Sequence, residues 1–226
     1  MASFSSINRG SPIRSFQTDF ELGYNRYNIT AILPGYLFNE EKTKETFDDD
    51  GWLKSGDIVT SVEGYFSIAG RIKELIITAG GENIPPVLIE DTIKSELPCI
   101  SNAIVIGDRR KFLACLLTLK VDFDADTMIP QKTLAPNTLA WLQTIGVNNV
   151  QTVEEAMKTP AIGEAIQKGI DRANTRATSS AQRIQKWIVI PVDFSLPGGE
   201  LGPTLKMKRH VVHEKNSQVI EDFYRS

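Results

Sequence analysis

Apolar and polar positions predict short strands in the first part of the chain. Two β-rich runs, residues 58–62 and 65–69, are separated by Glu63-Gly64, a pair typical of a hairpin turn. The acid-rich segment 39–50 precedes them and predicts a solvated helix followed by a turn. The segment up to residue 70 is therefore expected to be rich in β-structure.

A helix is predicted after a third short apolar run at residues 75–78. Pro85 and Pro86 would open this helix, because proline is tolerated in a first helical turn. Apolar residues recur at a spacing of four on one predicted face: Leu88 or Ile89, Ile93 and Leu97. We interpret Glu90, in the same helix, as a surface acid.

Two further strands are predicted at residues 103–106 and 112–119, paired around the polar turn 107–110. The second of them is nearly all apolar, which predicts a central strand covered on both faces. Residues 187–190 predict another strand, and residues 210–224 predict a helical end.

Residues 122–180 predict a helical insert. Thr152 and Glu155 have the spacing of a capping box, which marks the start of a helix. A later helix carries an apolar stripe at a spacing close to four: Ile162, Ile166, Ile170 and Ala173. The predicted fold class is therefore α+β, with mixed short sheets and a helical insert.

Composition excludes several function classes. The 226 residues are 41% hydrophobic and 23% charged, which is ordinary globular usage. A net charge of −3 argues against nucleic acid as a partner. The longest apolar stretch, residues 112–117, falls far below the roughly 20 residues of a transmembrane helix. Cys99 and Cys115 are too few for a disulfide framework, which favours a reducing compartment.

Residues 1–18 are rich in serine, carry arginine and contain no acid, as organelle transit peptides do. However, Gly10 and Pro12 interrupt any amphipathic pattern, so we do not expect organelle targeting. A divergent, poorly ordered N-terminus is expected over residues 1–30.

Two familiar site patterns fail. His210 and His213 could supply two metal ligands, whereas a metal needs three or four, so no metal site is predicted. The glycines before Lys206 do not form a Walker loop, because Leu205 precedes the lysine and Met207 follows it.

A weaker set of residues fits nucleotide chemistry. The Asp57 carboxylate could accept hydrogen bonds from the vicinal hydroxyls of a ribose, and Arg71 could offer its planar fork to the sugar or a phosphate. Gly80 and Gly81 would let a ligand approach the main chain. Each feature alone is common.

Together, four segments resemble motifs of the acyl-adenylating superfamily, and within it the bubblegum type of long-chain fatty-acyl-CoA synthetase. The segments are GWLKSGD at 51–57 (ribose-binding motif), GYFSIAGRIK at 64–73 (hinge motif), LIITAGGENIPP at 75–86 (glycine loop) and GELGPTLKMKR at 199–209 (C-terminal motif). The resemblance covers about residues 32–226.

The resemblance implies a role for each matching residue. These roles are ribose binding by Asp57 with Arg71, a hinge at Lys73, a CoA-side loop at Gly80, Gly81 and Glu82, and catalysis of adenylation by Lys206. Alternatives stay open: Lys208 could be the reactive lysine, Asp57 could only cap a turn, and Lys73 could be an ordinary exposed lysine.

The resemblance also implies a domain plan. Residues 31–72 would be a remnant of the large AMP-binding domain, and residues 73–226 a mobile C-terminal lid domain with its insert. An orphaned apolar face is expected on the remnant, with Val59, Phe66 and Ile68 exposed. The ATP phosphate loop and the acyl pocket of the family do not occur in the sequence.

The implied function is part of a ligase that converts fatty acid, ATP and CoA to acyl-CoA, AMP and pyrophosphate. Magnesium would accompany ATP, bound mostly by the large domain, and a separate large domain is a possible partner. We expect the chain alone to be inactive. The alternative is a non-enzymatic binding or regulatory fragment. The expected location is the cytoplasm, with peripheral association with the endoplasmic reticulum membrane as an alternative.

Overall fold

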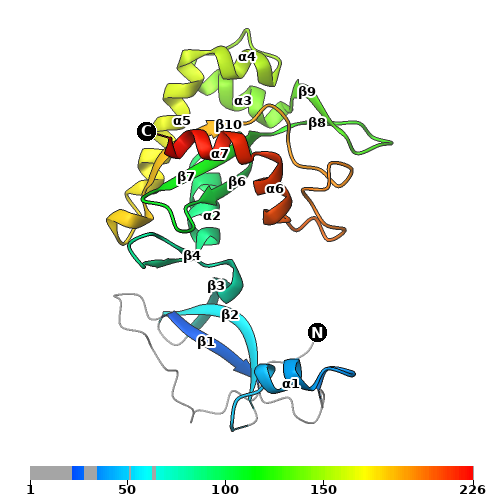
Figure 1. Ribbon diagram of the computed structural model, residues 1–226. Helices are drawn as coiled ribbons and strands as arrows, with labels where there is room; N and C mark the ends of the chain where they lie inside the picture. The colour runs from blue at the N-terminus through cyan, green and yellow to red at the C-terminus, as the bar shows by residue number, and fades with distance from the viewer. Residues whose placement is uncertain (1–21, 28–34, 51, 63–64, 226) are drawn as a thin grey trace. The chain divides into compact units, whose positions relative to one another are not determined.

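The computed structural model describes residues 22–27, 35–50, 52–62 and 65–225 (Figure 1). The chain divides into two compact units, residues 1–75 and residues 76–226. The expectations for residues 1–18 lie outside the described residues. Among the described residues, none of the helices combines the length and the apolar composition of a membrane span.

The first unit is built on a three-stranded antiparallel sheet in the order β1-β2-β3. Its strands are β1 (Leu22–Tyr27), β2 (Leu53–Val62) and β3 (Tyr65–Arg71), and β3 leads into the 3-10 turn η1 (Ile72–Glu74). Val62 pairs with Tyr65, which confirms the predicted pairing, while the turn residues 63–64 lie outside the described residues. The predicted acidic helix is α1 (Glu40–Thr46), capped by the Asn39 side chain.

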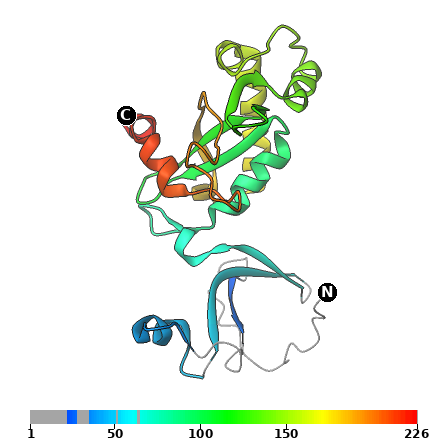
Figure 2. The ribbon, with the colours of Figure 1, turned by 90° about the vertical axis from the view of Figure 1, so that its right-hand side faces the viewer.

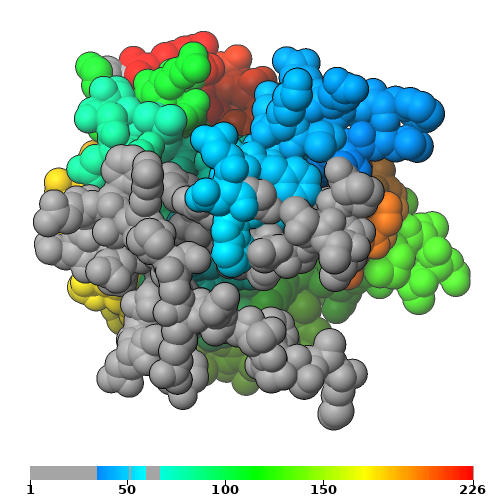
Figure 3. Space-filling view, turned by 90° about the horizontal axis from the view of Figure 1, so that it is seen from below, coloured from blue at the N-terminus to red at the C-terminus, as the bar shows by residue number. Residues whose placement is uncertain are grey.

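The expected exposed apolar face is only partly present. Ile68 is 67% exposed, as predicted, but the prediction for Val59 is wrong, since this residue is 5% exposed. A register shift between Ile58 and Val59 interrupts the alternation of β2, so two successive side chains are buried. The side chain of Phe66 lies outside the description. The surface of α1 and the preceding turn, blue in Figure 3, adds the exposed side chains Leu37 and Phe38.

The second unit is built on a three-stranded sheet in the order β10-β7-β6. Its strands are β6 (Ile100–Ile106), β7 (Leu113–Leu119) and β10 (Ile184–Val189). The pair β6–β7 is antiparallel, and β10 runs parallel to β7. Every residue of β7 is buried, which confirms the predicted central strand.

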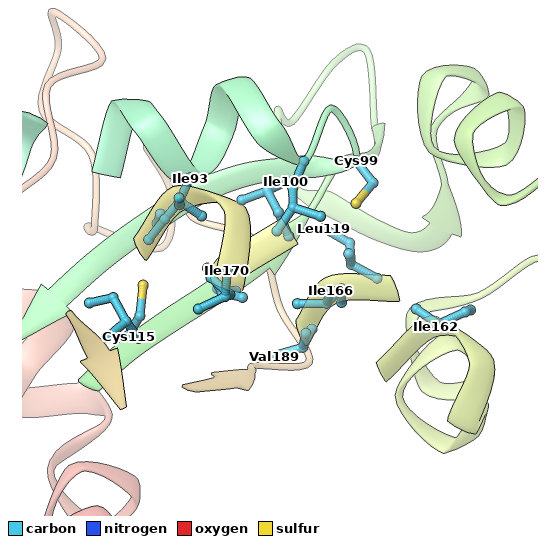
Figure 4. Packing of buried hydrophobic residues seen from close by; sticks show 14 of the residues in the cluster. Ile93, Cys99, Ile100, Cys115, Leu119, Ile162, Ile166, Ile170 and Val189 are labelled. Atoms are coloured by element: carbon cyan, nitrogen blue, oxygen red, sulfur yellow. The ribbon is translucent and has the colours of Figure 1, made fainter. Parts of the chain in front are cut away.

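Helices cover both faces of this sheet (Figure 2). One face packs on α2 (Pro86–Glu96) and α5 (Pro160–Asn174), and the other on α6 (Arg209–Lys215) and α7 (Ser217–Tyr224). Alternate residues of the strands divide between the two cores, because successive side chains of a strand point to opposite faces. Cys115 thus lies in the α2–α5 core, shown in Figure 4, and Leu116 in the α6–α7 core.

The predicted insert shares the main core. Its elements are β8 (Val121–Phe123), β9 (Pro130–Leu134), α3 (Pro136–Thr144), α4 (Val153–Lys158), α5 and η2 (Ser180–Gln182). The capping box of Thr152 and Glu155 is present, and the predicted α5 stripe is buried, with Ile170 next to Ile93 of α2 (Figure 4). The α+β class is therefore confirmed, and the β8–β9 hairpin is a strand pair that the sequence analysis missed.

Candidate functional site

Asp57 and Arg71 face each other across the β2–β3 pair. They are register partners, and Arg71 Nε lies 3.3 Å from Asp57 Oδ1. Gly56, just before Asp57, has φ +76°, a conformation that glycine adopts at no steric cost. The Arg71 side chain is 61% exposed and open to a ligand, whereas the Asp57 side chain is 19% exposed and only partly accessible. The structure thus brings together the two residues predicted to grip a ribose.

Lys73 is exposed within η1, directly after β3. The division between the two units follows Leu75, two residues further along the chain. The predicted hinge residue therefore lies in the first unit, close to its boundary with the second.

The glycine loop is the tip of a small hairpin formed by β4 (Ile76–Ile77) and β5 (Asn83–Ile84). Thr78 closes the loop: its N–H donates to the Glu82 carbonyl (3.1 Å), and its Oγ1 accepts from the Glu82 N–H (3.2 Å). Gly80 and Gly81 are exposed, and Gly81 has φ +82°. The Glu82 carboxylate accepts a 2.8 Å hydrogen bond from the Ser179 hydroxyl, after α5. The loop is tightly closed yet presents its glycine backbone to solvent.

Lys206 lies on a second tight turn, which we call the lysine hairpin (residues 200–208). The Gly202 N–H donates to the Lys206 carbonyl (2.8 Å), and the Lys208 N–H donates to the Glu200 carbonyl (2.7 Å). Leu205 adopts a left-handed conformation with φ +59°, which reverses the chain immediately before Lys206. Both Lys206 and Lys208 are exposed. The hairpin presents two ammonium groups, so the choice between them stays open on geometry.

The entry of the lysine hairpin is fixed by Glu200. Its carboxylate accepts from Lys215 Nζ of α6 at 2.5 Å and from the Ser195 N–H at 3.3 Å. Burial opposes ionisation of this carboxyl group, but the hydrogen bond from Lys215 leads the effects that hold its pKa below the usual value. Glu200 is therefore a charged anchor of the hairpin.

Glu90 corrects the prediction of a surface acid, because it is only 5% exposed. It lies on the buried face of α2 with Pro86 and Ile93. Both oxygens of its carboxylate are bound by Arg209, the last residue of the C-terminal motif. The sequence signal was an acid on an otherwise apolar helix face, together with an arginine in a motif far along the chain.

His210 and His213 are both on α6, and His213 is partly buried. Burial lowers the pKa of His213, Arg209 lowers it further, and Asp108 opposes the change. Within residues 35–50, 52–59 and 67–225, no three His, Cys, Asp or Glu residues gather as a ligand set for a metal ion. We assign no magnesium ligand to the described side chains.

Residues 73–140 match the family model described as "AMP-binding enzyme C-terminal domain". Long-chain-fatty-acid–CoA ligase ACSBG2 from Xenopus laevis is 49% identical over 196 residues, covering 85% of this chain and 26% of the relative. ACSBG1 from Bos taurus is 49% identical over 197 residues (86% and 27%). The ligase heimdall from Drosophila melanogaster is 45% identical over 216 residues (86% and 32%). The chain thus spans between 26% and 32% of the length of these relatives.

Solved structures share the fold at lower identity. The adenylation domain of a carboxylate reductase from Mycobacterium chelonae has a TM-score of 0.66 at 20% identity, covering 95% of this chain and 30% of that one. The equivalent domain from Segniliparus rugosus, solved with AMP and a co-purified carboxylic acid, has a TM-score of 0.64 at 22% identity (94% and 30%). In sequence, the chain therefore matches a part of the bubblegum-type long-chain-fatty-acid–CoA ligases, and it shares its fold with adenylation domains.

Proposed function

We propose that the chain supplies the C-terminal functional residues of a long-chain-fatty-acid–CoA ligase. The overall reaction converts fatty acid, ATP and CoA to acyl-CoA, AMP and pyrophosphate. The names of the relatives give this reaction class, and the match over 85% of the chain supports its transfer. The chain spans about a quarter of the Xenopus laevis relative, and we propose that it works together with the large domain of such a ligase.

The presentation of Lys206 is the observation that carries this proposal. Attack of a fatty-acid carboxylate on ATP spreads negative charge over the phosphate oxygens, and a well-placed ammonium stabilises that charge. The lysine hairpin holds an exposed Lys206 directly after a left-handed turn residue. Lys206 is thus proposed to bridge carboxylate and phosphate oxygens in the adenylation step.

The other motif residues take supporting roles in this proposal. Asp57 binds the ribose hydroxyls of ATP and of the acyl-adenylate, and Arg71 assists from 3.3 Å away. Lys73 acts as the hinge, supported by its place two residues before the division of the units. The loop of Gly80, Gly81 and Glu82 serves the CoA step, supported by its exposed glycine backbone.

The unit before the hinge is proposed to be the final strip of the large AMP-binding domain, over residues 31–72. The division of the chain after Leu75 supports this assignment, because it separates these residues from the second unit. ATP is proposed to bring magnesium, held by the large domain.

The proposed location is the cytoplasm, supported by two buried cysteines that form no disulfide. Peripheral association with the endoplasmic reticulum membrane is the alternative.

A chimera tests the proposal. The chain replaces the matching 196-residue segment of the Xenopus laevis ligase, which provides the large domain in the same polypeptide. Fatty-acid-dependent ATP–pyrophosphate exchange measures adenylation, and release of acyl-CoA from preformed acyl-adenylate measures the second step. The chimera is expected to catalyse both steps and the isolated chain neither.

Two matched variants then assign the lysine. Lys206→Ala is expected to abolish exchange, while thioester formation from preformed adenylate is less affected. Lys208→Ala removes the same charge two residues away and is expected to retain exchange. Loss of exchange only in Lys208→Ala would transfer the role to Lys208, and equal loss of both steps in Lys206→Ala would contradict the assigned role.

A non-enzymatic binding or regulatory fragment is the competing function. The observation in favour of this alternative is that the chain covers only 26% of the Xenopus laevis ligase. An isolated chain without activity agrees with either function, so the chimera decides between them: absence of exchange in a folded chimera would favour the fragment.

A further inference from the structure

Glu90 is a buried carboxylate that the proposed function does not use. It lies in the middle of α2, on the face where Pro86 and Ile93 are also buried. Burying an ionised carboxylate is costly unless its charge is paired and hydrogen-bonded. Its partners therefore show why an acid occupies this position.

These partners come from two other segments of the second unit. Glu90 Oε1 accepts from the Val105 N–H of β6 at 2.8 Å and from Arg209 Nη1 at 2.7 Å. Glu90 Oε2 accepts from Arg209 Nη2 at 2.6 Å. Two parallel bonds from one guanidinium to one carboxylate fix orientation as well as distance. Glu90 thus joins a helix, a strand and the start of α6.

Arg209 directly follows the lysine hairpin. It lies three residues after Lys206, and the neighbouring Lys208 N–H closes the hairpin by donating to the Glu200 carbonyl. At the entry, Glu200 is paired with Lys215. Both ends of the hairpin are therefore tied by ion pairs, and the one at the exit reaches a helix 119 residues earlier in the sequence.

We infer that Glu90 is a positioning residue for Lys206. Through Arg209 it fixes the exit of the lysine hairpin to α2, the same helix that follows the glycine loop. The two loops assigned to the two steps of the reaction are thereby held on one helix. Only the catalytic role of Lys206 in this inference rests on the proposed function; the restraint on the hairpin does not.

Glu96 provides a matched control on the same helix. Its carboxylate accepts from Arg172 Nε at 2.8 Å and pairs with Arg176, so it also receives two arginine contacts. These arginines lie on α5 and on the segment after it, so the contacts tie Glu96 to α5 and not to the lysine hairpin. Glu90→Gln and Glu96→Gln therefore make the same chemical change at two places on α2. Only Glu90→Gln is expected to affect the lysine hairpin.

Amide hydrogen exchange of the 226-residue chain is the first test. Because hydrogen bonds to charged groups are the stronger ones, Glu90→Gln is expected to speed exchange at the Gly202 and Lys208 amides about tenfold or more. Amides of α5 should keep their rates. Glu96→Gln should leave the hairpin amides unchanged. Equal acceleration throughout the chain, or an unchanged hairpin in Glu90→Gln, would overturn the inference.

Arg209→Lys is a second variant that tests the same contact if Glu90→Gln does not fold. Lysine keeps the positive charge but cannot make the two parallel bonds of a guanidinium. In this variant, amide exchange at Gly202 and Lys208 is expected to be faster than in the wild-type chain, but by a smaller factor than in Glu90→Gln. Wild-type exchange in the hairpin of Arg209→Lys would also overturn the inference.

The chimera provides the second test, through the division between kcat and KM. Glu90→Gln is expected to lower kcat for ATP–pyrophosphate exchange about tenfold or more with the KM for ATP unchanged, because Glu90 is not proposed to touch ATP. Glu96→Gln should keep both values. If Lys206→Ala retains exchange, the proposed function fails, whereas the hydrogen-exchange result decides the positioning role independently.

Discussion

Gly169 of α5 leaves no space for a side chain, because Leu97 lies directly against it. A Cβ atom at Gly169 would be 2.3 Å from Leu97 Cδ2. Leu97 follows α2 and is buried, so it cannot move away without disturbing the core. This contact sets how closely α5 approaches α2 on one face of the sheet.

Gly169→Ala is therefore expected to destabilise the chain, despite the higher helix propensity of alanine. Overpacking of this kind costs about 1–3 kcal/mol. Gly163→Ala, in the same helix, is the control, because a Cβ there has nothing within 4 Å. It should stabilise the chain by about 0.5–1 kcal/mol. Denaturant unfolding of both variants measures the difference, and a stabilised Gly169→Ala would contradict the packing.

Asp57→Asn and Arg71→Gln are expected to affect ligand binding far more than stability. Because the Arg71 side chain is 61% exposed, the ion pair is screened by water and should contribute at most about 1 kcal/mol. In the chimera, either change should raise the KM for ATP about tenfold or more, as charged hydrogen bonds to the ribose are lost. A thermal melt and steady-state kinetics separate the two effects. A large loss of stability without a change in KM would favour the turn-capping role of Asp57.

The two cysteines are expected to be unreactive in the folded chain. Burial raises the pKa of Cys99 to about 12 and raises that of Cys115 well above its usual value. The reactive thiolate is therefore scarce near pH 8, and the thiols are also covered by the core. Reaction with a thiol reagent should be at least about a hundredfold slower than in denaturant. Rapid labelling of either cysteine in the native chain would disagree with this burial.

His213 is expected to make the chain less stable as the pH falls below 6.5. Burial, with help from Arg209, lowers the folded-state pKa of His213 below the ordinary value of 6.5, while Asp108 opposes the shift. The unfolded chain then binds the proton first, so stability is full above pH 6.5 and is lost as the pH falls through the folded-state pKa. His213→Gln should reduce this dependence, measured by urea unfolding from pH 7.5 to 5. An unchanged slope in the variant would assign the dependence to other groups.

The sequence predicted most of the second unit because its signals are local. Burial could be predicted from the apolar pattern alone for β7 and for the α5 stripe of Ile162, Ile166 and Ile170. The capping box at Thr152 likewise needs only its own helix. Such elements could be read without knowing their neighbours.

Features that depend on distant partners were harder to predict. The charge of Glu90 suggests solvent until Arg209, 119 residues away, is known to bind it. Val59 is buried because of a bulge, which depends on how β2 pairs with β3. For the candidate site, motif resemblance selected Asp57, Arg71 and Lys206, but not the anchors that hold the lysine hairpin in place.

The arrival of β10 beside β7 has a consequence for shortened versions of this chain. The first residue of β10, Ile184, comes 65 residues after the end of β7 at Leu119, yet their backbones are parallel neighbours. Any truncation before Ile184 would leave the most apolar strand with an open edge, and such edges recruit strands from other molecules. Premature termination in this region should therefore yield self-associating material instead of a smaller working unit.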